Sequence, residues 1–236
     1  ENHHHGVAHE EYFGYDEYHN ECKYHKCGNV FIREIVMKLI ENTDLNAQNK
    51  YGKTALMFAC ACPKMAKSHD VMRVLCENTD MNLVSRAGTT ALSRLIKNQT
   101  IYNDMDAIMM FQNSNINAAD DLVYDVIDYT YYAKDTRVMM YLLEMGLEVD
   151  KLRHDITPLM HVVKRGVIPP LKDEFLRYMS QESIDRRVAE HRGLQQQQQD
   201  TCGQIITLLL NYGANRADAL EEAREVGNEV AVRMLE

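Results

Sequence analysis

The chain has no tryptophan and only four prolines among its 236 residues, and alternating runs of valine, isoleucine and phenylalanine are scarce. Alternation of that kind is typical of half-buried strands, and proline interrupts helices. Helix is therefore the expected secondary structure. No apolar run approaches the roughly 20 residues that a membrane-spanning helix needs, and the N-terminus lacks the basic and then apolar order of a secretory signal. These absences predict a soluble protein.

Cysteine and positive charge are also in short supply. The six cysteines are far sparser than in small disulfide-stabilised domains, which favours a reducing, intracellular compartment, cytoplasmic or nuclear. The 35 acidic side chains outnumber the 26 basic ones, for a formal net charge of −9. Because that charge repels phosphate backbones and anionic lipid headgroups, we expect neither nucleic acid nor a membrane as partner. The first residue is Glu1 rather than methionine, which suggests a fragment of a longer protein.

One polar hexapeptide is present twice. Residues 41–46 read ENTDLN and residues 77–82 read ENTDMN, at an offset of 77 − 41 = 36 residues, and an apolar run precedes each copy. The duplication continues, because GKTAL at residues 52–56 matches GTTAL at residues 88–92 with the same offset. Self-similarity with a period of about 20 to 50 residues is typical of stacked repeat architectures.

Weaker copies follow the first two. Asn117 stands 117 − 82 = 35 residues after Asn82, and Asp150 stands 150 − 117 = 33 residues after Asn117. The next junction, around Gly213, restores the period only after an insertion of about 34 residues is subtracted. The last residues form a two-helix pattern without a preceding loop, as expected of a capping repeat.

These features resemble the ankyrin-repeat family, whose units of about 33 residues combine a glycine-containing turn, a helix opened by Thr-Pro-Leu-His, and a second helix ending before Gly-Ala. The best matches are TPL at residues 157–159, LLL at 208–210 followed by GA at 213–214, and TAL at 54–56. The resemblance implies an all-α solenoid of about six helix-turn-helix units, with capping end units and a helical insertion.

The predicted domain organisation is an N-terminal extension or cap at residues 1–27 and an ankyrin-repeat domain at residues 28–236. The first helix of the first unit is expected within residues 19–26. The insertion, at about 167–200, is interpreted either as a docking element or as an excursion that packs on itself. Its five consecutive glutamines, residues 195–199, predict a mobile linker.

The start of each first helix carries a threonine that can cap the unpaired backbone N–H groups, and Pro158 is expected at the first helical position of its unit. Apolar residues recur at helical spacing and should face the neighbouring units. These expected core residues are Leu56, Ala59, Leu92, Leu95, Ile127, Leu159 and Val162.

For function, the resemblance implies a protein–protein interaction scaffold, a monomer that binds a protein partner through the loop tips and first helices of its concave face. The residues carried over onto that surface are Gln48, Lys50, Tyr51, Lys53, Arg86, Asp121, Leu122, Tyr124, Tyr132, Arg153, His154 and Arg165. Tyr124 and Tyr132 are expected to project from it as aromatic anchors. Tyr129 and Tyr131 are expected to pack between units instead.

Charge is unevenly distributed in the later units. The acidic, tyrosine-rich stretch YDVIDYTYYAKD is followed by a unit that carries Lys151, Arg153, His154, Lys164 and Arg165. If the two segments adjoin, their surface suits a partner of mixed charge. The alternative is a scattered, solvated face.

The N-terminal segment contains His19, Cys22, His25 and Cys27, four zinc-competent side chains within nine residues. Three of them would share one helix face, whereas Cys27 needs a turn to join them. No second ligand pair stands at the usual distance. A zinc site and a polar capping helix with incidental His and Cys are therefore both open interpretations.

Catalytic motifs are scarce. Cys60 and Cys62 with His69 invite a thiolate nucleophile and an imidazole base, but nothing marks a third orienting group, and Cys60 is expected to fill a small gap in the core. Phosphate-binding loops and the His-Glu-x-x-His motif are absent from the sequence. The rival hypotheses to a scaffold are a substrate-recruiting part of a larger enzyme, a metal-dependent activity that uses the His- and Cys-rich N-terminus, and an effector that an intracellular bacterium delivers into a host cytoplasm.

Overall fold

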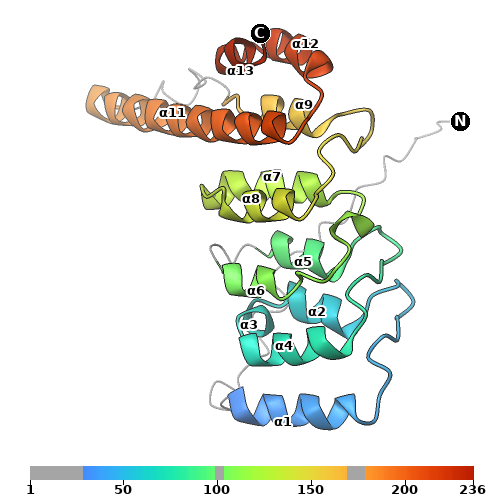
Figure 1. Ribbon diagram of the computed structural model, residues 1–236. Coiled ribbons are helices and arrows are strands. Elements are labelled where there is room, and N and C mark those ends of the chain that lie inside the picture. The colour runs from blue at the N-terminus through green and yellow to red at the C-terminus, as the bar shows by residue number, and fades with distance from the viewer. Residues whose placement is uncertain (1–28, 99–103, 169–178) are drawn as a thin grey trace, which may run out of the picture.

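The structure is a computed structural model, and it describes residues 29–98, 104–168 and 179–236. In this part of the chain the regular elements are twelve α-helices and one short 3-10 helix, and the only strand-like pairing is an isolated bridge between Arg153 and Ile156. The helices are stacked in layers from α1 at one end to α13 at the other (Figure 1). The all-α fold class is confirmed.

The elements in chain order are α1 (Asn29–Ile40), α2 (Ala55–Ala61), α3 (Pro63–Ala66), α4 (His69–Asn78), α5 (Ala91–Lys97), α6 (Met105–Met109), η2 (Ile116–Ala118), α7 (Leu122–Ala133), α8 (Arg137–Glu144), α9 (Pro158–Arg165), α11 (Gln181–Asn211), α12 (Ala217–Glu225) and α13 (Glu229–Leu235).

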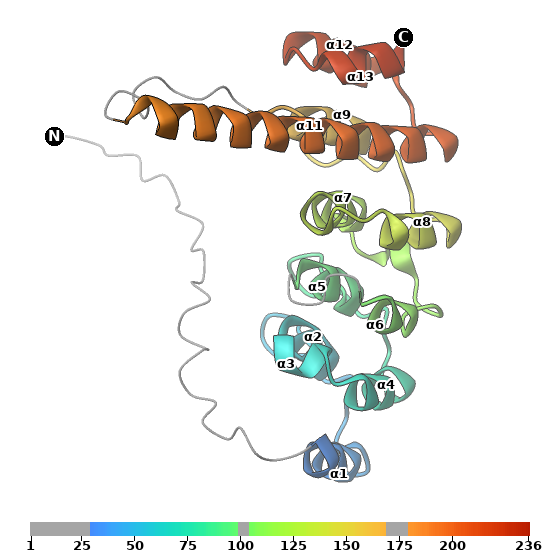
Figure 2. The same ribbon diagram turned by 90° about the vertical axis from the view of Figure 1, so that its left-hand side faces the viewer.

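The helices form two rows. In the first row α2 packs on α5, α5 on α7, α7 on α9, and α9 on α12. In the second row α1 packs on α4 and α4 on α6, and α8 follows along the same side (Figure 2). The layers after α1 thus pair one helix of each row, whereas α1 has no first-row partner among the described helices, and loops connect the layers along one edge. None of the described helices is both long enough and apolar enough to cross a membrane.

The first-row helices begin as the sequence predicts. The side-chain oxygens of Thr54, Thr90 and Thr157 each accept a hydrogen bond from the backbone N–H three residues further on. Such caps satisfy donors that the first turn of a helix leaves unpaired. Pro158 occupies the first position of α9, where its missing N–H costs nothing.

The hydrophobic core consists of apolar side chains that are buried between neighbouring helices of the stack. All the apolar residues expected there from helical spacing are at most 6% exposed. Cys60, expected to fill a gap, is fully buried at 0%. Because a helix buries its apolar residues against the neighbouring layers and against the other helix of its own layer, removing one buried leucine is expected to cost about 2 to 5 kcal/mol.

A ladder of hydrogen bonds runs along the loops and ties each layer to the next. In each step a side-chain oxygen of one loop accepts from a backbone N–H of the following loop. The pairs are Asn46 with Asp80 (2.7 Å), Asn82 with Asn115 (2.6 Å), Asn117 with Glu148 (3.0 Å) and Asp150 with Asn215 (2.9 Å).

The ladder relates the sequence period to the geometry. Its first three steps span 34, 33 and 31 residues, whereas the fourth spans 65. The fourth step contains the predicted insertion, and it ends in the same contact as the others. The additional residues therefore leave the register of the stack unchanged.

The repeated hexapeptide is the joint between layers. Asn42 and Asn78 each donate to the carbonyl oxygen four residues earlier, which closes the end of the preceding helix. Asp80 then accepts from the N–H of Asn82 in a local turn at 2.9 Å. The hexapeptide is thus a connector, as its position after an apolar run indicates.

The prediction of a mobile linker at residues 195–199 is wrong. These glutamines lie within α11, a single helix of 31 residues whose N-terminal part extends past the other helices of the stack (Figure 1). Glutamine has a good helix propensity, and the tract is anchored. Gln197 accepts from Lys134 Nζ at 2.6 Å, and the amide of Gln198 donates to the carbonyl oxygen of Arg165 at 2.6 Å.

Candidate functional site

The surface residues carried over from the sequence lie on the loops before α2, α5, α7 and α9 and on the first-row helices. All except Leu122 and Tyr124 are exposed or half-buried. Gln48 is exposed, yet its amide donates to the carbonyl oxygens of Gly52 and Val84 and so helps to join two loops. Whether these residues bind a partner stays a prediction.

The loop before α2 has a rigid tip. Gly52 adopts a positive φ of 72°, and a Cβ placed on it would lie 2.8 Å from the backbone nitrogen of Arg86 in the next loop. That nitrogen donates to the carbonyl oxygen of Tyr51 at 3.0 Å. A residue with a side chain would be strained by the positive φ and by the close approach. The glycine therefore allows two successive tips to lie side by side.

Cations and aromatic rings are interleaved at this tip. Lys50 Nζ lies 5.0 Å from the centroid of the Tyr51 ring, and Lys53 Nζ lies 5.9 Å from the rings of both Tyr51 and Phe58. Tyr51 is 55% exposed and Phe58 is 52% exposed. Partial burial, with a contribution from the positive charge of Arg94, lowers the pKa of Lys53. Cation–π contacts of this kind hold long side chains over a ring.

Phe58 is absent from the predicted surface residues, although the sequence contains a signal for it. Leu56, Ala59 and Cys60 face the core of the stack. At about 100° per residue, position 57 lies beside the buried face, whereas position 58 lies on the side of the helix opposite Leu56 and Cys60. An aromatic residue there is a candidate contact residue.

Tyr124 contradicts the prediction that it projects into the concave face. Its side chain is only 1% exposed. Its hydroxyl donates to the carbonyl oxygen of Lys151 at 2.8 Å and also lies within hydrogen-bond distance of the carbonyl oxygen of Ile156. Burial raises the pKa of Tyr124 to about 12. Tyr124 is therefore a packing residue that joins α7 to the loop of the next layer.

Leu122 is also buried, at 1% exposure, because it opens α7 and its side chain belongs to the core cluster. The other tyrosines of α7 behave as expected. Tyr129 and Tyr131 are buried between layers. Tyr132 is 54% exposed, and its ring lies 5.7 Å from the guanidinium carbon of Arg165.

The acidic and basic segments adjoin, and they pair with each other. The carboxylates of α7 and its preceding loop contact cations of the neighbouring layers, mostly those of α9 and its loop. The pairs are Asp120 with Lys151 (3.1 Å), Asp121 with Arg153 (3.5 Å), Asp125 with Lys97 (3.2 Å), and Asp128 with both His161 (2.9 Å) and Arg165 (2.7 Å). A partner of mixed charge would have to compete with these internal pairs.

Two carboxyl groups of α7 are perturbed in opposite directions. Burial raises the pKa of Asp125 to about 6, against the opposing positive charge of Lys97. Burial also acts on Asp128, but the hydrogen bond from His161 and the guanidinium of Arg165 outweigh it and lower the pKa of Asp128. The environment of Asp128 thus favours the ionised carboxylate, whereas the environment of Asp125 favours the protonated acid and weakens its ion pair with Lys97.

Comparison with known protein families identifies the repeats. A family model described as ankyrin repeats, three copies, matches residues 26–120. The chain therefore contains ankyrin repeats in residues 26–120. The loop ladder continues beyond the matched residues, since the contact that Asn46 makes with Asp80 is repeated between Asp150 and Asn215. No curated protein matches the chain.

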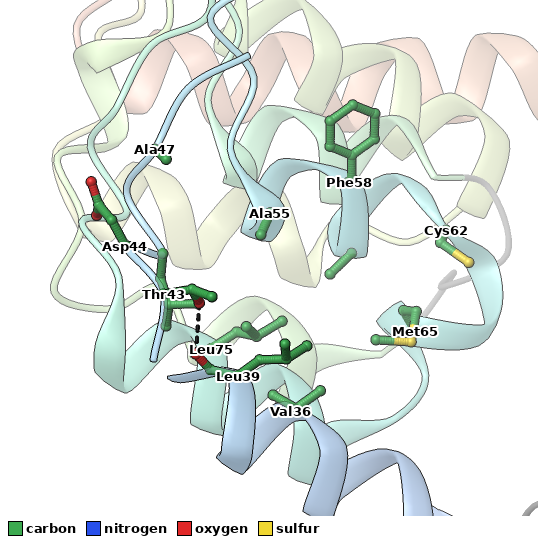
Figure 3. A pocket seen from close by; sticks show the side chains of 12 residues that line it. Val36, Leu39, Thr43, Asp44, Ala47, Ala55, Phe58, Cys62, Met65 and Leu75 are labelled. Atoms are coloured by element: carbon green, nitrogen blue, oxygen red, sulfur yellow. Dashed lines mark hydrogen bonds between the residues drawn. The ribbon is translucent and has the colours of Figure 1, made fainter. Parts of the chain in front are cut away.

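A pocket of about 530 Å³ lies at the N-terminal end of the ankyrin stack, between α1 and α2 (Figure 3). Val36 and Leu39 line it from α1, Phe58 from α2, and Met65 from α3. In the first row no described helix follows α2 toward this end. The helix predicted within residues 19–26 lies outside the described residues.

The zinc ligand candidates His19, Cys22, His25 and Cys27 also lie outside the described residues, so a zinc site there stays a prediction. Within residues 29–98, 104–168 and 179–236, no group of three or more His, Cys, Asp or Glu side chains could hold a metal ion.

Cys60, one of the two cysteines near α2, is buried in the core of the stack. Burial raises the pKa of Cys60 well above its usual range, so the side chain is a neutral thiol at physiological pH. His69 uses its Nε2 atom to contact Asp104 Oδ2 at 2.9 Å. Asp104 also caps α6, so this contact joins the layers of α4 and α6.

Proposed function

We propose that this protein is an interaction scaffold that binds a protein partner through its loop tips and first-row helices. One observation carries the proposal: exposed aromatic and charged side chains stand on tips that the loop ladder and the Gly52 turn hold in place. Ordered aromatic groups bind with little loss of conformational entropy, which makes them effective anchors. Ankyrin repeats generally mediate protein–protein interaction.

The anchors that fit this role are Tyr51, on the loop before α2, and Tyr132, on α7. Both are more than half exposed, at 55% and 54%. Each also has a cation over its ring, Lys50 for Tyr51 and Arg165 for Tyr132. Tyr124 has no such role, because its side chain is covered by the next layer.

The test is capture from cell lysate with the double variant Tyr51→Ala/Tyr132→Ala, compared with the wild type by quantitative mass spectrometry. A matched control is Met109→Ala/Met140→Ala, which shortens two side chains exposed by 46% and 41% on α6 and α8 of the second row. We expect the tyrosine variant to lose a set of proteins that the wild type and the methionine variant retain. Equal capture by both variants would contradict the proposed surface.

The scaffold is proposed to act as a monomer, which light scattering on the purified chain checks directly. Recruitment of a substrate for a catalytic domain of a longer protein would use the same surface. The identity of the captured proteins distinguishes that role from a scaffold of two or more binding proteins.

A further inference from the structure

The loop tips and first-row helices of the α2 and α5 layers contain no acidic residue of their own. No Asp or Glu occurs in residues 45–69, which hold the tip before α2 together with α2 and α3, or in residues 81–103, which hold the tip before α5 and α5, although Asp44 and Asp80 directly precede these two stretches. The chain as a whole carries a formal net charge of −9. The charge of this part of the surface is therefore positive, opposite to the net charge of the whole chain.

The next layer has the reverse composition. Between Lys97 and Lys134 the chain contains no Lys or Arg, and the carboxylates of α7 and its loop neutralise the cations of the following layer. By contrast, none of the carboxylates in the described ranges forms an ion pair with Lys50, Lys53 or Arg86. Their positive charges are available to a ligand.

These three cations are also gathered by the fold. The Arg86 N–H donates to the Tyr51 carbonyl oxygen, which places the two loop tips side by side. Lys50 and Lys53 both lie over the Tyr51 ring, so the charges border an exposed aromatic surface. A ligand with carboxylates on either side of an apolar side chain would complement this arrangement.

We propose that Lys50, Tyr51, Lys53 and Arg86 bind an acidic peptide segment of the partner, with Asp or Glu carboxylates against the cations and an apolar side chain against Tyr51. The inference rests on the proposed function, because it specifies the chemistry of the bound partner. A lysine ammonium can donate to carboxylates that approach from many directions, unlike the fixed fork of arginine. A segment without a defined secondary structure therefore suits the patch.

A short acidic peptide fits better than a nucleic acid or an anionic membrane. The stretches without acidic residues cover only the layers of α2 and α5, and α7 packs directly on α5. A long polyanion running along the first row would meet Asp120 and Asp121, which are 79% and 40% exposed at their side chains. The repulsion confines an anionic ligand to the N-terminal part of the face.

The inference is tested by fluorescence anisotropy at low salt with a labelled 12-residue probe of alternating Asp and Glu around a central Phe. A probe with Lys in place of every acid, a single-stranded DNA oligonucleotide and phosphatidylserine vesicles serve as competing ligands. We expect the acidic probe to bind more tightly than all three, and its affinity to fall as salt is raised past about 0.15 M.

The decisive variant is Lys50→Ala/Lys53→Ala. Its matched control is Lys38→Ala/Arg73→Ala, which removes the same charge from exposed positions on α1 and α4 of the second row. We expect affinity for the acidic probe to fall about tenfold in the first variant and less than about twofold in the control. Circular dichroism is used to check that both variants fold.

Equal losses in the two variants would overturn the inference, as would a wild type that binds the Lys-substituted probe as tightly as the acidic one. Tighter binding of DNA or vesicles would also overturn it, by assigning the patch to another class of ligand. The proposed function and the acidic ligand can be contradicted independently of each other. If proteins lost by Tyr51→Ala/Tyr132→Ala are still captured by Lys50→Ala/Lys53→Ala, the scaffold stands and the acidic ligand does not.

Discussion

The side-chain oxygen of Asn46 accepts a hydrogen bond from the backbone N–H of Asp80 at 2.7 Å, and so the last residue of one ENTDxN copy binds the fourth residue of the next. The side chain of Asp80 in turn accepts from the N–H of Asn82, and the side-chain oxygen of Asn82 accepts from the backbone N–H of Asn115. The two copies are thus consecutive steps of one ladder. A short polar acceptor is needed at each step because the donor is a backbone group whose position the stack fixes.

Replacing that acceptor should weaken the stack. Asn46→Ala leaves the Asp80 N–H without its partner and is expected to lower the free energy of unfolding by about 1 kcal/mol. Asn46→Asp keeps an oxygen in place, as Asp150 does in the fourth step, and should cost less than half as much. Urea denaturation of the two variants measures the difference. An aspartate variant as unstable as the alanine variant would argue against the ladder.

The buried position of the Tyr124 side chain can be tested by substitution. Tyr124→Phe removes the hydroxyl that bonds to the Lys151 carbonyl and keeps the ring, so we expect a loss of about 1 to 2 kcal/mol in unfolding free energy. Tyr132→Phe changes a ring that is 54% exposed and should stay within about 0.5 kcal/mol of the wild type. Similar values for the two variants would mean that Tyr124 is not held in the core.

Asp125 should make stability depend on pH between about 4 and 6. Its side chain is 8% exposed, Lys97 Nζ lies 3.2 Å from its Oδ2 atom without the alignment of a hydrogen bond, and its pKa in the folded state is raised to about 6. The folded state therefore holds the proton more tightly than the unfolded chain. The resulting stabilisation is complete below the unfolded-state pKa and is lost as pH rises through 6, by up to about 3 kcal/mol.

The variant Asp125→Asn isolates that effect, because it remains neutral at every pH. Relative to the wild type, the variant should be more stable at pH 7 than at pH 4, as measured by chemical denaturation at each pH. Asp128 has the opposite sign, since its lowered pKa contributes stability above the unfolded-state pKa and loses it as pH falls. Asp128→Asn should therefore lose stability relative to the wild type as pH is raised from 3 to 7.

The position of an added residue in α11 should decide whether the protein tolerates it. One extra Gln within residues 195–199 leaves a glutamine opposite both Lys134 and the Arg165 carbonyl, and we expect the unfolding free energy to change by less than about 0.5 kcal/mol. One extra Gln after Gly203 turns Cys202, which is fully buried, out of its site. That insertion should cost more than about 2 kcal/mol. Equal tolerance in a thermal denaturation series would contradict the anchoring of the tract.

The sequence predicts those parts of the fold that depend on local patterns. Leu92 and Leu159 stand at helical spacing after a capping threonine, and both are buried as that spacing requires. The stacking of successive layers could also be predicted, because units that repeat at a nearly fixed period make the same contacts with their neighbours.

What the sequence conceals depends on contacts between distant residues. Nothing near Tyr124 in the chain shows that its hydroxyl donates to a carbonyl oxygen 27 residues later, so the local sequence alone predicts an exposed position for this tyrosine. The glutamine tract has no apolar periodicity of its own. Its helix is continuous with the buried segment that follows, and its anchors, Lys134 and Arg165, belong to other layers.

The uniformity of that tract has a mechanical consequence for α11. An α-helix turns by about 100° and rises about 1.5 Å with each residue. Adding or removing one glutamine would therefore rotate and shift residues 181–194, which precede the tract, while the same type of side chain still occupies both anchoring positions. The number of glutamines in the tract would therefore set the direction in which residues 181–194 present their side chains, while the contacts with Lys134 and Arg165 stay the same.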